Sequence, residues 1–212
     1  MRLVLCYHAV SPTWEHRLSI HPELLLRQVR ALRRFRRVQV TFDDALRSAS
    51  RVFPELKCLG VPIQIFVCTA YARDGAPLTI PELAGDDLDE LATMTWDELR
   101  SHAADGIGIG AHTVSHPHLP LLSDHELRSE LADSKSELEA ELGNPCIDLA
   151  YPYGEHDERV RAAVRAAGYE TAFALWGGPK DDPYAAPRLD LYRRHSPTRA
   201  VLMSTPLHRL VA

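Results

Sequence analysis

The 212-residue sequence lacks several features that define whole classes of protein. No apolar run approaches the roughly 18–20 residues that cross a bilayer, so we expect no membrane span. The formal net charge is -5, which gives no indication of nucleic-acid binding. Repeats and low-complexity linkers are also absent. With 45% hydrophobic and 25% charged residues, the chain is expected to form one globular domain over residues 1–212.

Cysteine is scarce, with four residues at positions 6, 58, 68 and 146 and no CxxC pair. Three of them lie in apolar runs, which favours buried free thiols over disulfides or a metal knuckle. The first ten residues, "MRLVLCYHAV", are too short in their apolar part for a secretory signal and predict a strand. We therefore expect a cytoplasmic protein, or a secreted one if a leader has been removed. The oligomeric state is left open.

Short apolar runs alternate along the chain with amphipathic segments. In residues 23–35, Leu25, Val29 and Leu32 recur at helical spacing, and Thr95 and Ser123 each begin a capping box. Asp74–Thr93 shows no period and is interpreted as a surface insertion. This alternation predicts an α/β fold, a distorted (β/α) barrel of about seven strands. The expected strands are Arg2–Tyr7, Val38–Phe42, Val61–Cys68, Ile107–Gly110, Ile147–Tyr151, Glu170–Leu175 and Arg188–Leu191.

Reactive side chains follow four of these strands. In (β/α) barrels the chemistry lies at the carboxyl ends of the strands, so these groups are expected to converge. They are His8 after the first strand, Asp43 and Asp44 after the second, His112 and His116 after the fourth, and Tyr151-Pro152-Tyr153-Gly154 after the fifth.

Asp44, His112 and His116 together form a suitable ligand set for a catalytic divalent metal. Two neutral imidazoles and one carboxylate leave positions open for water. Successive strand residues point to opposite faces, so the chain must bend where Asp43 and Asp44 meet. A metal ion would offset the repulsion between the two acids, and Asp43 could then take a proton from an activated water. Taken alone, an Asp-Asp pair or an HxxxH pattern is more often structural than metal-binding. The further histidine His118 is also interpreted as structural, because no interaction partner for its side chain is predicted.

Three segments, "TFDDA", "HTVSHPHL" and "LAYPYGEHD", resemble motifs of the polysaccharide deacetylases, carbohydrate esterase family four. The similarity extends from about Arg2 to Leu189. It implies a barrel that removes N-acetyl groups from an amino sugar with Zn²⁺, although Co, Ni, Mn or Fe could also fit. By this resemblance Asp43 is the general base, and Asp44, His112 and His116 are the metal ligands.

The resemblance also assigns the backbone N–H of Tyr153 to the oxyanion, with Tyr151 and Pro152 beside the substrate. Many members protonate the leaving nitrogen with a histidine on a late strand. This chain instead has "LCYH" after its first strand, as in circularly permuted members, so His8 is the expected acid. A strand-end histidine bonded to the backbone is the alternative interpretation of His8, and His195 is the reserve candidate.

The chain departs from the family pattern at two positions. Ala45 stands where glycine is usual, so a positive φ there would be strained. Ala150 stands where an arginine often orients the base, and Arg188 in "APRLDL" is the candidate to supply that charge. We also place Arg188 among the substrate-binding residues. Trp176 could line a sugar site or simply pack.

Two other functions are compatible with parts of this pattern. A non-haem iron oxygenase uses two histidines and a carboxylate, but it gives no role to Asp43. A sugar-binding protein without catalysis would fit the changes at Ala45 and Ala150, but not the intact acids and histidines. The substrate itself is not identified.

The arginine-rich segment 27–37 could form a patch for an anionic polymer, although a solvated helix face explains it more simply.

Overall fold

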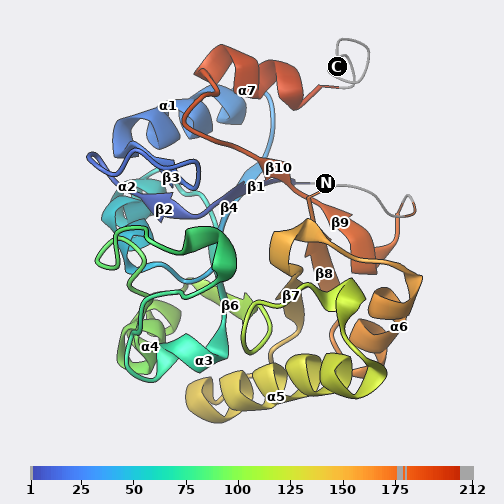
Figure 1. Ribbon diagram of the computed structural model, residues 1–212. Coiled ribbons are helices and arrows are strands. Elements are labelled where there is room, and N and C mark those ends of the chain that lie inside the picture. Colours follow the sequence, from blue (N-terminus) through green and yellow to red (C-terminus); the bar gives the residue numbers. More distant parts are fainter. Residues whose placement is uncertain (1, 176–178, 180, 206–212) are drawn as a thin grey trace.

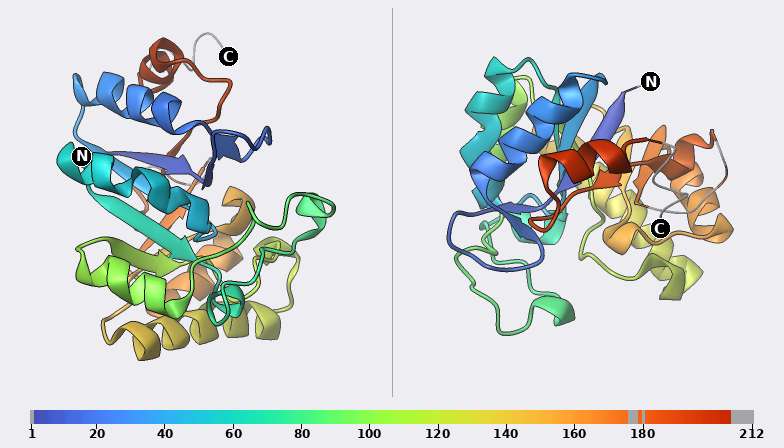
Figure 2. Two further views of the ribbon diagram at one scale, coloured as in Figure 1. Left: turned by 90° about the vertical axis from the view of Figure 1, so that its left-hand side faces the viewer. Right: turned by 90° about the horizontal axis from the view of Figure 1, so that it is seen from above.

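An eight-stranded parallel sheet curls into a nearly closed barrel, with helices on its outer face (Figures 1 and 2). The computed structural model describes residues 2–175, 179 and 181–205. The strands follow the order β10-β1-β4-β5-β6-β7-β8-β9 around the barrel. They are β1 (Leu3–Tyr7), β4 (Val38–Phe42), β5 (Ile63–Val67), β6 (Gly108–Ala111), β7 (Asp148–Ala150), β8 (Thr171–Ala174), β9 (Ala186–Pro187) and β10 (Leu189–Asp190). The single-domain α/β barrel is as predicted.

Each of the seven expected strands is present, and the last one closes the barrel. Residues 186–187 pair with β8 and residues 189–190 pair with β1, so β9 and β10 are two parts of one segment. Arg188 is the residue between them. The closing segment therefore connects the two edges that the sheet would otherwise leave open.

Several helices begin at a residue whose side chain accepts a hydrogen bond from a free backbone N–H group. Thr95 and Ser123 form the predicted capping boxes, and Asp157 accepts a hydrogen bond from Val160 N–H. Helix α5 ends at Gly143, whose φ of 69° is left-handed. The α-helices are α1 (Pro22–Arg33), α2 (Phe53–Cys58), α3 (Thr69–Ala72), α4 (Trp96–Ala104), α5 (Asp124–Leu142), α6 (Glu158–Ala166) and α7 (Pro197–Met203).

The remaining elements are short and carry little periodic signal, so they were not predicted. They comprise the pair β2 (Ala9–Val10) and β3 (Ser19–Ile20), which forms a separate two-stranded sheet, and several 3₁₀ turns. These turns are η1 (Arg47–Val52), η2 (Pro81–Leu83), η3 (Leu119–Leu121), η4 (Pro152–Gly154) and η5 (Pro183–Ala185). Helices α2, α3 and α7 were likewise not foreseen.

Side chains fill the barrel interior below its carboxyl end. A hydrogen-bonded group at the amino end joins Gln39 to Gln64 (2.9 Å) and Gln64 to Asp148 (2.7 Å). Above it lies an apolar cluster of Phe66, Ala150 and Phe173, with Val4 and Ala186 packed against it. Because this part of the barrel is filled, its chemistry is confined to the carboxyl end.

The predicted surface insertion, residues 74–93, is less exposed than expected. Its residues Leu78, Leu83 and Leu91 are buried in a second apolar cluster, against Trp14 and Leu18 of the segment that joins β2 to β3. Ser11 also donates a hydrogen bond to Glu90 (2.5 Å). The two segments thus support each other at the carboxyl end of the barrel, where they form one wall of the cavity described below.

The cysteines are free thiols, and Cys6, Cys68 and Cys146 are buried, as predicted. Among the described residues, none of the helices combines the length and the apolar character that would let it span a bilayer.

Packing inside the barrel predicts different effects for two glycines of β6. An added Cβ at Gly110 would lie 2.7 Å from the Phe66 ring and 2.9 Å from the Asp148 carbonyl oxygen. At Gly108 its nearest neighbour would be 3.4 Å away. We expect Gly110→Ala to lower the free energy of unfolding by about 1–3 kcal/mol, and Gly108→Ala to change it little. Urea unfolding of both variants measures this, and equal effects would contradict the packing argument.

Candidate metal and catalytic site

Polar side chains from several strand ends line one cavity of about 220 Å³. It contains His8 after β1, Asp43 and Asp44 after β4, and His112 and His116 after β6. Tyr153 lines the cavity as well, together with Leu18 and Ile80 from the wall formed by the two packed segments. The convergence expected from the strand ends is therefore present.

The chain bends sharply between Asp43 and Asp44, as the adjacent acids required. Asp43 N–H still donates to the Tyr7 carbonyl (2.9 Å), in the direction of the sheet. Asp44 and Ala45 then adopt positive φ values of 66° and 50°. A left-handed conformation costs roughly 1–2 kcal/mol for a residue other than glycine, so the strain predicted at Ala45 is real. This bend lets both carboxylates reach the same cavity.

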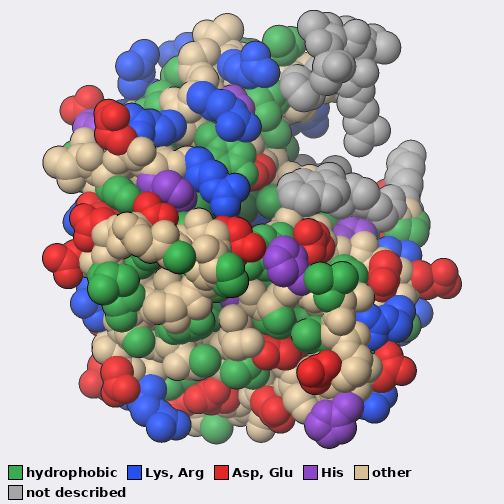
Figure 3. Space-filling view, viewed as in Figure 1, with side chains coloured by type: hydrophobic (Ala, Val, Ile, Leu, Met, Phe, Trp, Pro, Cys, Tyr) green, Lys and Arg blue, Asp and Glu red, His purple; other side chains and the backbone are tan. Residues whose placement is uncertain are grey.

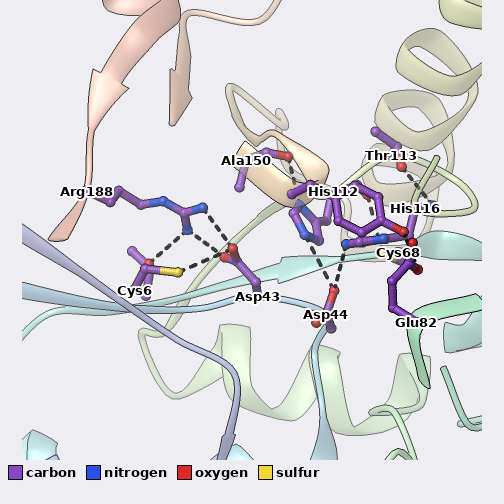
Figure 4. A network of polar contacts seen from close by, with 12 residues as sticks. Cys6, Asp43, Asp44, Cys68, Glu82, His112, Thr113, His116, Ala150 and Arg188 are labelled. Carbon is purple, nitrogen blue, oxygen red and sulfur yellow. Dashed lines mark hydrogen bonds and ion pairs between the residues drawn. The ribbon is translucent and has the colours of Figure 1, made fainter. Parts of the chain in front are cut away.

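Asp44, His112 and His116 are buried side by side (Figure 4). Asp44 Oδ1 lies 3.5 Å from His112 Nε2 and 3.4 Å from His116 Nε2. In a tetrahedral site with bonds of about 2.0–2.2 Å, ligand atoms are about 3.3–3.6 Å apart. His112 Nδ1 lies 2.8 Å from the Ala150 carbonyl oxygen, which can only accept a hydrogen bond. Nε2 of that ring is therefore left with a lone pair for a ligand.

The charges of this group also fit a divalent cation. Burial lowers the pKa of His112 and of His116 to about 4, so both imidazoles are neutral near pH 7. Burial raises the pKa of Asp44. Within the described chain, Asp44 Oδ1 has no hydrogen-bond donor. A buried carboxylate oxygen that faces two neutral nitrogens lacks a positive partner, and a metal ion would supply one.

Asp43 has a different partner, the guanidinium of Arg188 (Figure 4). The two groups form a bidentate ion pair with N–O distances of 2.5 and 2.8 Å. The Cys6 thiol also donates to Asp43 (3.4 Å), and Arg188 donates to Thr41 (3.1 Å). Burial alone would raise the pKa of Asp43, but Arg188 outweighs it and holds this pKa well below its usual range. Asp43 is thus ionised at neutral pH.

Arg188 therefore supplies the charge that the sequence lacks at Ala150. Its guanidinium lies 5.4 Å from the centre of the Phe66 ring, between the apolar cluster and the cavity. The side chain is 0% exposed and contacts Asp43 directly. Its assignment as a substrate-binding residue stays a prediction, whereas its contact with Asp43 is direct.

Tyr153 is held in a left-handed conformation with φ of 58°. Its ring stacks on His118 at 3.9 Å, and its hydroxyl donates to Glu82 of the insertion (3.0 Å). His118 Nδ1 in turn lies 2.8 Å from Glu155. The prediction that His118 has no partner is wrong, because its partners come from distant segments of the chain. Together these contacts fix the backbone of Tyr153 at the cavity.

His8 is half-buried in the cavity, near Asp43. Nitrogen, sulfur and oxygen atoms of His8, Cys6 and Asp43 lie within 4.8 Å of one another. Asp190 is a further carboxylate whose pKa is raised by burial and lowered in part by the charge of His8. Asp190 was not predicted, although its spacing of two from Arg188 places both on one face of a strand.

The other candidates lie outside the cavity lining. Tyr151 is buried and donates to the Tyr184 carbonyl (2.8 Å), and Pro152 is buried next to it. His195 is also buried, and its Nδ1 accepts from Tyr192 N–H (3.1 Å). The arginines beside it, Arg193 and Arg194, are exposed. Trp176 lies outside the described residues.

The model of the family described as "Polysaccharide deacetylase" matches residues 33–172, about two thirds of the chain. The chain belongs to the polysaccharide deacetylase family. YxkH of Bacillus subtilis (strain 168), which is named for the same family, is 26% identical over 152 residues. That match covers 71% of this chain and 47% of YxkH, so the chain spans about half the length of this curated relative.

Solved structures of low sequence identity share the fold. The Streptococcus pyogenes deacetylase PplD, in complex with acetate, has a TM-score of 0.80 at 20% identity, with 97% of this chain and 98% of PplD covered. IcaB from Ammonifex degensii has a TM-score of 0.75 at 24% identity, with 96% and 97% covered. These matches confirm the barrel over nearly its whole length.

The buried ion pair predicts a pH-dependent contribution to stability. The pKa of Asp43 is lowered in the folded protein, so the pair stabilises fully above the unfolded pKa of about 4. Its contribution decreases as the pH falls towards the lowered pKa. Arg188→Met leaves Asp43 buried and uncompensated, and should lower the free energy of unfolding by about 3–5 kcal/mol at pH 7. Urea unfolding at several pH values measures both effects.

The control is the double variant Arg188→Met/Asp43→Asn, which removes the uncompensated charge. It should be more stable than Arg188→Met alone. Equal stabilities of the two variants would show that the ion pair does not determine the loss.

The ligand set predicts binding of a divalent cation. Zn²⁺ at 100 times its dissociation constant should stabilise the folded chain by about 2.7 kcal/mol. His112→Ala or His116→Ala should abolish this stabilisation, whereas His125→Ala, an exposed histidine on α5, should retain it. Equilibrium dialysis and thermal unfolding with and without Zn²⁺ provide the measurements. Undiminished binding to the His112 variant would exclude this site.

Proposed function

We propose that the protein is a metal-dependent hydrolase that removes N-acetyl groups from an amino sugar in a glycan or glycoside. The proposal rests mainly on one arrangement: the Asp44, His112 and His116 set lies in the same cavity as the ionised Asp43. Membership of the polysaccharide deacetylase family supports an acetylated carbohydrate as the substrate class. Zn²⁺ is the preferred metal, because its usual ligands include histidine and carboxylate groups.

In this proposal Asp44, His112 and His116 hold the metal. The ion would polarise the acetyl carbonyl and lower the pKa of a water molecule towards about 7. Asp43 is a weak base, so it requires water whose pKa has been lowered in this way. Asp43 accepts a proton from the attacking water, while Arg188 keeps its carboxylate ionised and oriented. Tyr153 N–H donates to the oxygen that becomes negative when water adds to the carbonyl carbon.

His8 completes the proposed reaction as the acid. It delivers a proton to the amide nitrogen as the C–N bond breaks, which releases acetate and a free amine. Asp190, on the closing segment, is a carboxylate close enough to His8 for the two side chains to interact electrostatically. His195 is a weaker candidate, because its Nδ1 already accepts a backbone hydrogen bond away from the cavity lining.

The two alternative functions account for less of the site. An oxygenase would use the same three ligands but leaves the Asp43–Arg188 pair without a purpose. A binding protein without catalysis would not need an ionised carboxylate beside a metal site. The left-handed backbone at Ala45 removes no side chain from the cavity. The charge that is missing at Ala150 is supplied by Arg188.

The proposal is tested by acetate release from a panel of N-acetylated monosaccharides, chitin-like oligomers, peptidoglycan fragments and exopolysaccharides. The protein is stripped with a chelator and reloaded with Zn²⁺ or Co²⁺. Asp43→Asn and His8→Ala should each lower kcat by about 10²–10⁴-fold, the usual contribution of a general base or acid. His125→Ala should match the wild type.

Acetate release that persists in Asp43→Asn would show that Asp43 is not the base. Sugar binding without release under any metal would favour the binding protein. Iron-dependent oxygen uptake would favour the oxygenase.

A further inference from the structure

Arginine is concentrated on one part of the surface, around the end of α1. Six exposed arginines occur between positions 27 and 37, and Arg2 is exposed beside them. In the described part of the chain, arginine and lysine ion pairs are formed by other residues: Arg47, Arg51, Lys57, Arg100, Lys135, Arg159, Arg161, Arg188 and Arg193. This positive surface is therefore not neutralised by acids, although the chain as a whole has a net charge of -5.

Four of these residues surround one hollow at the amino end of the barrel. Arg2, Arg33, Arg36 and Arg37 line a cavity of about 340 Å³, with Gly60 and Pro62. Arg2 precedes β1, Arg37 precedes β4, and Pro62 precedes β5, so three neighbouring strands begin there. In the left view of Figure 2, the start of β1 and the end of α1 lie at the end of the barrel opposite the segments around residues 9–20 and 74–93. We call the surface formed by Arg2 and the six exposed arginines between positions 27 and 37 the arginine patch.

A solvated helix face explains only part of the arginine patch. It accounts for Arg27 and Arg30 on α1 and for Arg34 directly after it, which follow helical spacing. It does not account for Arg2, which arrives from a different element and joins the same hollow. Nor does it explain Phe35, which lies between Arg34 and Arg36 with 71% of its surface exposed. Figure 3 draws the opposite face, the carboxyl end of the barrel, where acidic side chains lie among the basic ones over most of the surface.

We propose that the arginine patch docks the protein on an anionic phospholipid surface. Guanidinium groups form paired hydrogen bonds with phosphate oxygens, and the hollow lined by four of them can receive a headgroup phosphate. Each basic residue near an anionic membrane strengthens association, and an exposed phenylalanine can enter the interface between headgroups and acyl chains. Charge complementarity and the exposed aromatic ring together favour lipid.

Nucleic acid fits this surface less well. Proteins that bind single strands stack successive bases on several aromatic side chains, whereas Phe35 is the one large hydrophobic residue strongly exposed between positions 27 and 37. Docking at the amino end would leave the catalytic cavity, at the carboxyl end, facing away from the membrane and open to a glycan. The inference does not depend on the deacetylase activity.

Vesicle co-sedimentation of the whole chain tests the proposal. Vesicles of phosphatidylcholine alone are compared with vesicles that contain 30% phosphatidylglycerol, at low and at high salt. We expect binding to the anionic vesicles only, with steep weakening at high salt. Arg36→Gln/Arg37→Gln should weaken binding at least tenfold, from the loss of two basic residues near the surface. Phe35→Ser should weaken vesicle binding as well, and this loss should depend less on salt than the loss caused by Arg36→Gln/Arg37→Gln.

The matched control is Arg73→Gln/Arg128→Gln, which removes the same charge from exposed residues elsewhere. It should bind vesicles like the wild type, and all variants should keep the same unfolding midpoint. Equal effects of the two double variants would overturn the proposal, because charge alone would then explain binding. Absence of vesicle binding, with or without binding to an oligonucleotide or to inorganic phosphate, would overturn it too.

Discussion

The ion pair between Arg188 and Asp43 is the interaction on which the remaining structure depends. Both side chains are buried, and removing two charges from water costs several kcal/mol for each. The cost is offset by two charge-assisted hydrogen bonds and by contacts with Thr41, Cys6 and the Phe66 ring. Arg188 belongs to the segment that closes the barrel, so the pair connects the closure of the sheet to the charge of the candidate base.

The two adjacent aspartates are treated differently by their surroundings. The Asp43 carboxylate is compensated by the guanidinium, whereas Asp44 faces two neutral imidazoles and has no cation of its own among the described residues. The bend between them, with positive φ at Asp44 and Ala45, separates these two environments within one cavity. Their repulsion is thus reduced by one protein cation, Arg188, and would be reduced further by a metal ion bound at Asp44.

Much of this site could be predicted because strand ends and ligand chemistry are local features of a sequence. His112, His116 and the two aspartates follow apolar runs directly, and the parallel sheet brings such ends together. Contacts between distant segments could not be predicted in the same way. The hydrogen bond that holds Tyr153 is accepted by Glu82, in an insertion without periodicity. The sequence of that insertion also gave no indication that it would pack against the residues after β2.

Short elements were the other limit of the sequence. Strands β2 and β3 have two residues each, and α3 has four, so no period can be recognised in them. Asp190 is an intermediate case. Its position two residues after Arg188 could have identified it, since both must face the same side of a strand, but the closing segment is too short for alternation to stand out.

The closing segment pairs with each neighbouring strand through only two residues. Arg188 and Asp43 are also 145 residues apart in the chain, so their contact requires a large loss of chain entropy before it forms. We expect this closure to come late in folding, after the more local pairs of β1, β4 and β5. A transient opening at the same place would expose two sheet edges and release the base from its partner. The proposed hydrolytic activity would then be the last property gained in folding and the first lost in local unfolding.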